Sequence, residues 1–255
     1  MTPQSCLEAA RGNVSETWLK AKAAAKKISS ERGRLIGLYG LRKYWRVYGL
    51  FPPADGLRKA KRKRPLTEMT WEQALKLSTA AEPPYNLIFK LMLHTGIGTH
   101  EFLEFNTQHT WTEIREYLRS NPEKEYFSFT YMSRKTNEQP FRIFPPAPLL
   151  KEIFAGKVRL PFVTKGGAAL NLDNYRNSRA YVEAAFRRAR KKAGLPIELG
   201  AHDFRDTFKT VASRKLVAYE VKRFVMGHAV DAMGYDHCWN DSDWVWRELS
   251  KMFDD

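Results

Sequence analysis

The strongest constraint on how this chain can fold is a basic segment over residues 55–65, DGLRKAKRKRP. It follows Pro52 and Pro53, which end helices, and it has no apolar periodicity that could form a buried face. A segment of this composition acts as a linker because it has nothing to bury. The sequence therefore predicts two folded units, residues 1–54 and residues 66–255.

Positive charge is concentrated at the N-terminal end of the chain. Residues 1–66 carry 16 Lys or Arg and 4 Asp or Glu, which is +12 of a total formal charge of +15. Such a surface favours a polyanion, and double-stranded DNA fits better than a membrane because the chain has no long apolar run. A charge run is often only a solvated face, but five aromatic residues interrupt this one and favour binding. They are Trp18, Tyr39, Tyr44, Trp45 and Tyr48, and the expected DNA contacts here are Lys43, Arg46, Lys61, Arg62, Lys63 and Arg64.

Local patterns predict which parts of each unit are helical. Residues 15–50 fit two or three helices, the first with Ser15 as its N-cap. In the second unit, Thr70 and Gln73 have capping-box spacing ahead of a helical pattern. A later helix ends near Gly194 and is rich in basic residues close to its end. The DNA contacts expected from that helix are Arg187, Arg188 and Lys191.

An alternation of aromatic and polar residues predicts a β-hairpin in the second unit. Apolar side chains recur at every second position, stop at a polar turn and then return. The turn spans Lys135 to Gln139, and the flanking apolar residues are Phe127, Phe129, Tyr131, Phe141, Ile143 and Phe144. The predicted fold class is therefore α+β, mostly helical with a small antiparallel sheet.

One basic, aromatic-rich segment near the C-terminus holds residues suited to chemistry at a phosphate. A tyrosine hydroxyl has a pKa of about 10, and it attacks a phosphodiester only if the phosphate charge is neutralised and the leaving oxygen is protonated. Tyr235 is a candidate nucleophile, and Arg205 offers a planar, permanently charged fork. His202 precedes Arg205 by three residues and shares its helical face. His228 is a further donor, and Lys135 in the hairpin turn is a candidate general acid.

Each of these residues taken alone also has an ordinary explanation, since a single His, Lys or Tyr is usually a packing or surface residue. A metal site is not predicted, because the His, Asp and Cys residues between His228 and Cys238 match no zinc spacing. Cys6 and Cys238 form no disulfide framework, and the first residues lack the apolar core of a signal peptide. An intracellular location, in the cytoplasm or nucleoid or in a host cell, is therefore expected.

The order of these elements resembles the tyrosine recombinase (integrase) superfamily. HDFRDTF is similar to the family's His-x-x-Arg box, here His202 and Arg205, and VMGH is similar to its Gly-His box, which ends at His228. GYDHCW supplies Tyr235 downstream, and SRKTN stands where the family has a hairpin lysine, here Lys135. TGIGTHEFLEF resembles the family box that reads Thr-Gly-x-Arg-x-x-Glu-Phe/Leu. The N-terminal unit resembles the family's core-binding domain, though less specifically.

The likeness spans about residues 66–239 and has two departures. Gly98 occupies the place of the family's first arginine, while the other defined positions of that box match. Tyr235 follows His228 by seven residues, which is a shorter step than the family's usual spacing. Delivery of Tyr235 to the site of a neighbouring subunit therefore stays open.

The resemblance implies a helical DNA-binding domain over residues 1–54 and a catalytic domain over residues 66–255. It implies a site-specific recombinase that forms a 3′-phosphotyrosyl intermediate, works without a metal or nucleotide cofactor, and associates as a dimer to tetramer on DNA. Gly98 predicts impaired cleavage and keeps a second reading open, namely an inactive DNA-binding protein on the same fold. The tail over residues 241–255 places Val245, Leu249 and Met252 on one helical face, which either packs on a neighbouring protomer or covers the chain's own core.

Overall fold

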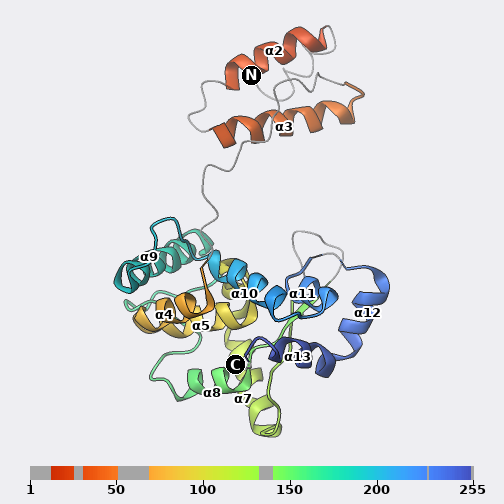
Figure 1. The fold of residues 1–255 in the computed structure, drawn as a ribbon. Coiled ribbons are helices and arrows are strands. Elements are labelled where there is room, and N and C mark those ends of the chain that lie inside the picture. Colours follow the sequence, from red (N-terminus) through yellow and green to blue (C-terminus); the bar gives the residue numbers. More distant parts are fainter. Residues whose placement is uncertain (1–12, 26–30, 51–68, 132–139, 229, 254–255) are drawn as a thin grey trace. The chain divides into compact units, whose positions relative to one another are not determined.

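The computed structural model describes residues 13–25, 31–50, 69–131, 140–228 and 230–253. The chain divides into two compact units, residues 1–65 and residues 66–255. Most of the described residues are helical, and two short strands form an antiparallel pair (Figure 1). The predicted fold class, mostly α with a small antiparallel sheet, is confirmed.

The first unit is built on two helices, α2 (Val14–Ala25) and α3 (Glu31–Val47). Trp18 and Trp45 are both buried and pack edge to face, with ring centroids 5.9 Å apart. The interpretation of these two tryptophans as part of a binding surface is therefore wrong, because they form the core between the helices. Ser15 is not the N-cap either. The helix begins one residue earlier, and the Asn13 side chain accepts a hydrogen bond from the backbone N–H of Glu16 at 3.0 Å.

The second unit surrounds one nearly buried helix, α5, of which eight of eleven residues are buried. Helices α4, α8, α9 and α10 pack against it, as Figure 1 shows. A helix that is apolar on most sides is stable only when neighbours cover it. The helices of this unit are α4 (Trp71–Ala80), α5 (Tyr85–Thr95), α6 (Thr99–Phe105), α7 (Gln108–Ser120), α8 (Ala147–Ala155), α9 (Tyr175–Ala193), α10 (Asp203–Arg214), α11 (Tyr219–Val225), α12 (Ala232–Asn240) and α13 (Ser242–Ser250).

Local signals in this unit act as the sequence predicts. The Thr70 side chain accepts from the backbone of Gln73 at 3.2 Å, and the Gln73 side chain accepts from the backbone of Thr70 at 2.9 Å. This capping box starts α4. Gly194 ends α9 with a left-handed backbone, φ 68°, which a residue with a Cβ rarely adopts.

The hairpin consists of β1 (Phe129–Tyr131) and β2 (Phe141–Ile143), paired with Phe129 opposite Ile143 and Tyr131 opposite Phe141. Tyr131, Phe141 and Ile143 are buried, so the aromatic alternation faces the core as predicted. The predicted turn from Lys135 to Gln139 lies outside the described residues.

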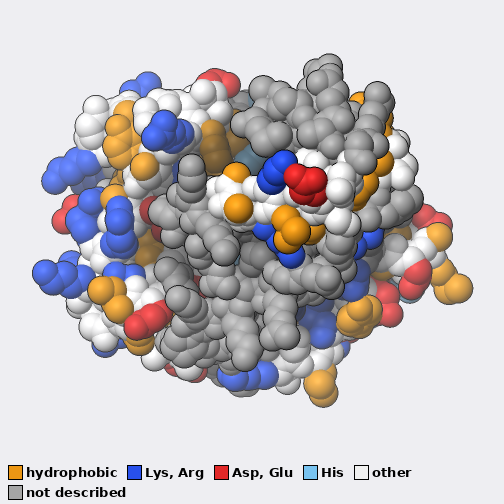
Figure 2. Space-filling model, turned by 90° about the horizontal axis from the view of Figure 1, so that it is seen from above, with side chains coloured by type: hydrophobic (Ala, Val, Ile, Leu, Met, Phe, Trp, Pro, Cys, Tyr) orange, Lys and Arg blue, Asp and Glu red, His pale blue; other side chains and the backbone are white. Residues whose placement is uncertain are grey.

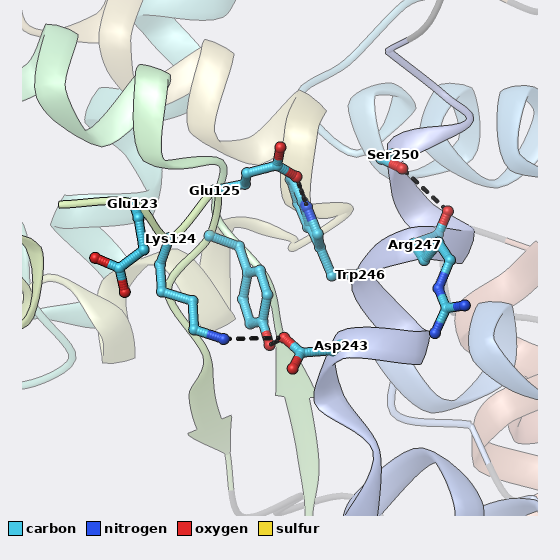
Figure 3. Close-up of a pocket in the computed structure, with 8 residues that line it drawn as sticks. Glu123, Lys124, Glu125, Asp243, Trp246, Arg247 and Ser250 are labelled. Atoms are coloured by element: carbon cyan, nitrogen blue, oxygen red, sulfur yellow. Dashed lines mark hydrogen bonds and ion pairs between the residues drawn. The ribbon is translucent and has the colours of Figure 1, made fainter. Parts of the chain in front are cut away.

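The C-terminal helix α13 covers the chain's own second unit. Val245, Leu249 and Met252, the face predicted from their spacing, are all buried. Trp246 stacks on Tyr126 with ring centroids 5.2 Å apart. Its Nε1–H donates to Glu125 at 2.8 Å, a hydrogen bond that Figure 3 draws. Of the two roles left open for the tail, the structure shows packing on its own core.

Candidate active site

Arg205, on the first turn of α10, is anchored between two backbone segments. Its Nη1 donates to the carbonyl of Gly96 at 2.8 Å, and its Nη2 donates to the carbonyl of Met226. Gly96 ends α5, and Met226 follows α11, so the guanidinium joins three helices. Burial lowers the pKa of Arg205, and the negative charge of Glu101 opposes this shift. A guanidinium has five N–H donors, so this anchoring leaves others to bind an anion.

Two glycines let the backbone approach closely enough to make these bonds. Gly96 has φ +69°, and a Cβ there would lie 2.6 Å from the ring of Phe208. Gly227 has φ +60°, and a Cβ there would lie 2.9 Å from the ring of Phe141. At each position, the positive φ and the short distance to a ring both disfavour any residue with a side chain. The Gly-His pair in the sequence thus has a structural reason, because the turn that delivers His228 passes directly over β2.

The two candidate histidines differ in how they are placed relative to Arg205. His202 immediately precedes α10, is exposed, and has helical dihedral angles, so it shares a face with Arg205 one turn later. His228 is exposed and its backbone N–H donates to the Arg223 carbonyl at 2.9 Å. The pKa of His228 is lowered first by burial and then by the positive charges of Arg205, Arg223 and Lys209. Three positive charges therefore act on the imidazole of the free protein, which is an environment that favours an anion.

Tyr235 lies on α12 and is partly buried. Its hydroxyl donates to the Pro140 carbonyl at 2.9 Å, and its ring stacks on Trp239 with centroids 5.8 Å apart. Burial raises the pKa of Tyr235, the charge of Asp236 adds to this, and the charge of Arg142 opposes it. Within the described part of the chain, no hydrogen bond joins this hydroxyl to Arg205. The structure thus brings Arg205 and His228 together but gives the hydroxyl of Tyr235 a different partner.

Gly98 precedes α6, is buried, and has an ordinary extended backbone with φ −89° and ψ 178°. A Cβ at this position would lie 2.9 Å from Oε2 of Glu101. The Glu101 carboxylate, whose charge acts on Arg205, therefore occupies the space where a side chain at position 98 would begin. An arginine at this position would meet no backbone strain, because the dihedral angles are ordinary. Its Cβ would contact only the end of the flexible Glu101 side chain, which can move.

Some of the other predicted site residues lie within the parts of the chain that the structure describes, and some lie outside them. Lys43 and Arg46 on α3, and Arg187, Arg188 and Lys191 on α9, are all exposed, as a DNA contact requires. Figure 2 shows Lys and Arg side chains gathered on the left of the view, the side on which α9 lies in Figure 1. The residues outside the described parts are Lys135, Lys61, Arg62, Lys63 and Arg64.

Nothing in the described parts of the chain forms a metal site, since no three His, Cys, Asp or Glu side chains come together there. Cys238 is buried, and burial raises the pKa of its thiol to about 12, which disfavours the thiolate that metals bind. In the same parts of the chain, no helix is long and apolar enough to cross a membrane.

Comparison with solved structures decides the fold. Neither family models nor curated protein sequences gave a match. The post-cleavage complex of the XerH site-specific recombinase with palindromic difH substrate matches with a TM-score of 0.55 and 16% identity, over 92% of this chain and 69% of that one. A lambda integrase dimer bound to a COC′ core site matches with a TM-score of 0.52 and 18% identity, over the same shares of the two chains. This chain has the tyrosine recombinase fold.

On this tyrosine recombinase fold, three basic residues near the site were missed by sequence reasoning. Lys209 follows Arg205 by four residues, so helical spacing alone could have found it. Arg223 lies on α11, and its backbone carbonyl accepts the hydrogen bond from the backbone N–H of His228. Arg142 had no sequence signal, because its partners on α12 and α13 lie 97 and 100 residues further along the chain.

Proposed function

We propose that the chain is a site-specific DNA recombinase that breaks and rejoins DNA through a 3′-phosphotyrosyl intermediate. The observation that carries the proposal is the anchored guanidinium of Arg205 beside His228, with the charges of Lys209 and Arg223 close enough to act on the same imidazole. A cluster of this kind binds a phosphodiester and neutralises the charge that develops on it during attack.

In the proposed reaction the hydroxyl of Tyr235 attacks the phosphorus and gives its proton to water. A phosphotyrosyl bond to the 3′ side of the DNA forms as the bond to the 5′ oxygen breaks, and that oxygen takes a proton from Lys135 as general acid. Arg205, His202 and His228 donate hydrogen bonds to the non-bridging oxygens. Attack by the freed 5′ hydroxyl of a partner strand reverses these steps and rejoins the DNA.

The proposed partner is double-stranded DNA, bound by the basic N-terminal unit and by α9. The XerH and lambda integrase structures were solved on DNA, the latter as a dimer, and both resemble this chain in fold. Self-association on DNA, from dimer to tetramer, and an intracellular location belong to this proposal. No metal or nucleotide cofactor takes part in it.

A second candidate function is a non-catalytic DNA-binding protein on the same fold. Gly98 favours it, since a glycine supplies no guanidinium to the phosphate. The hydrogen bond from Tyr235 to the Pro140 carbonyl also favours it, because a hydroxyl held there is not free to attack.

The experiment that separates the two candidates measures covalent adduct on a nicked suicide substrate, from which the cleaved fragment diffuses away. The recombinase leaves protein covalently attached to DNA, and the non-catalytic protein does not. Tyr235→Phe is expected to abolish the adduct and keep DNA affinity, because only the nucleophilic oxygen is removed. An adduct formed by the Phe variant would assign the nucleophile to another residue.

A further inference from the structure

Arg142, the central residue of β2, holds the end of the helix that carries Tyr235. Its Nη1 donates to the carbonyl of Trp239 at 3.0 Å and to the hydroxyl of Ser242 at 3.0 Å. Its Cζ lies 4.0 Å from the centre of the Trp239 ring, close enough for a cation–π interaction. One half-buried side chain therefore binds both the last turn of α12 and the start of α13.

The contacts between Arg142 and the end of α12 are favourable for the helix and make use of the shape of the arginine side chain. The carbonyls of the last helical turn have no partner within the helix, and a cation at that end also interacts favourably with the helix dipole. Trp239 is in the last turn of α12, so its carbonyl is such a group. An arginine supplies a planar donor that reaches a carbonyl, a hydroxyl and a ring face at once, which a lysine does not do equally well.

The residue that directly precedes the same strand holds Tyr235 itself. Pro140, two residues before Arg142, accepts the hydrogen bond from the Tyr235 hydroxyl. Tyr235 and Trp239 are one helical turn apart, and their rings are nearly parallel, with an interplanar angle of 14°. Arg142 on one face of Trp239 is therefore connected to Tyr235 through a stack of two rings. The position of the tyrosine is set by β2 as well as by α12.

Arg142 also acts on Tyr235 through its charge. The positive charge of Arg142 lowers the pKa of Tyr235, against burial and against Asp236 on the same helix. Helix α11 places Glu220 near Gly234 and Cys238, and its charge raises the pKa of Cys238. The charge of Arg142 thus favours the ionised form of Tyr235. Burial and the charge of Asp236, on the same helix as Tyr235, disfavour that form.

We propose that Arg142 is a positioning residue for Tyr235. It fixes α12 on β2 and keeps a positive charge beside the tyrosine, so that the hydroxyl is presented to the phosphate in one orientation. Attack requires the hydroxyl to leave the Pro140 carbonyl, but the contacts of Arg142 lie one turn away and persist while the tyrosine side chain rotates. This role rests on the recombinase function proposed above.

The test compares Arg142→Met, which removes the charge, with Arg142→Lys, which keeps it. Arg119→Met serves as the matched control, since Arg119 is an exposed arginine at the end of α7. Single-turnover adduct formation is measured at saturating suicide DNA, in the unsubstituted chain and in a Gly98→Arg background. Two substrates are used, one with the normal 5′ oxygen and one with a 5′-bridging sulfur, which leaves without a general acid.

We expect Arg142→Met to slow adduct formation on the order of 10²-fold, the loss typical of a misplaced reacting group. The loss should be equal for oxygen and sulfur leaving groups, because the nucleophile and not the general acid is affected. The limb of the pH profile on which the rate rises should move to higher pH in Arg142→Met, because Tyr235 loses the charge that lowers its pKa. Arg142→Lys should restore the position of that limb and recover part of the rate. Arg119→Met should match its parent.

Three results would overturn the role while leaving the recombinase function standing. One is an unchanged rate in Arg142→Met. Another is a loss confined to the oxygen leaving group, which would show that Arg142 acts through the hairpin turn with Lys135. The third is a loss that Arg142→Lys fails to reduce, with melting temperature and DNA affinity falling in step, which would make the residue merely structural. No adduct from any variant in either background would remove the proposed function and this role with it.

Discussion

Gly98→Arg is the substitution that tests the site most directly. The backbone at Gly98 is extended, with φ −89° and ψ 178°, so an arginine enters without strain. Its Cβ would lie 2.9 Å from Oε2 of Glu101, and that flexible carboxylate must move aside. The new guanidinium then has a carboxylate partner in Glu101 and an anchored neighbour in Arg205. A cation near a helix start costs about 0.3–1 kcal/mol, which pairing with Glu101 offsets, so folding stability should change by less than about 1 kcal/mol.

The effect on cleavage should be much larger than the effect on folding. One preorganised donor to the transition state typically contributes on the order of 10²–10³ in rate. The charges of Lys209 and Arg223 already reach the same region, and the new side chain has no second anchor. We therefore expect a gain of at least about tenfold, with near-normal DNA affinity in both forms.

The assay is single-turnover adduct formation on the nicked suicide substrate, with both forms at equal saturation. Gly98→Gln supplies bulk and hydrogen bonds without charge, and Gly98→Lys supplies charge without the planar fork. The order Arg, then Lys, then Gln and Gly is expected, since the fork contacts two oxygens at once. The reasoning is refuted if the Gly98 form already cleaves briskly and the arginine adds nothing. Another group would then neutralise that phosphate, and the alignment of TGIGTHEF with the family box would be wrong.

Three further predictions concern cleavage, binding and pH. Arg205→Ala should depress cleavage far more than DNA affinity, because the guanidinium stabilises charge that develops during the reaction; equal losses in the two measurements would make it a plain binding residue. Removal of residues 1–64 should weaken binding and flatten its salt dependence by about 0.9 in the log–log slope per lost phosphate contact, measured by fluorescence anisotropy. The pKa of His228 lies below its ordinary value in the free protein, and a bound phosphate should raise it, so binding takes up a proton and tightens as the pH falls toward the lowered pKa of the free protein. His228→Gln should remove that pH dependence, and equal slopes for both forms at constant salt would show that His228 does not meet the phosphate.

The parts of the fold that the sequence predicted are those that depend on neighbours in the chain. The capping box of Thr70 and Gln73 joins residues three apart, and the stop at Gly194 needs only one backbone angle. The hairpin follows from period-two alternation, which tells which side chains face the core. The misassigned tryptophans show the limit of such signals, because Trp18 and Trp45 become a core only when α2 meets α3.

The sequence named the candidate site residues but could not give the contacts that connect them. His202 and Arg205 share a helix, so their common face could be derived from spacing. The carbonyl partners of Arg205 lie 109 and 21 residues away, at Gly96 and Met226, and no local pattern announces them. No local pattern predicts the contacts of Arg142 either, because they depend on how α12 packs against β2.

The surroundings of Gly98 bear on how a protein with the proposed recombinase function could lose its chemistry. Arg205 is held by main-chain carbonyls and not by the residue at position 98, and the turn to His228 is shaped by Gly227. Under the proposed function, loss of an arginine at position 98 would leave these contacts in place and remove only one proposed donor to the phosphate. A protein altered in this way would keep its fold and its proposed DNA contacts, and a single substitution should restore its cleavage. Loss of Arg205 would differ, because two buried carbonyls would lose their partner and the packing of α10 on α5 would weaken with them.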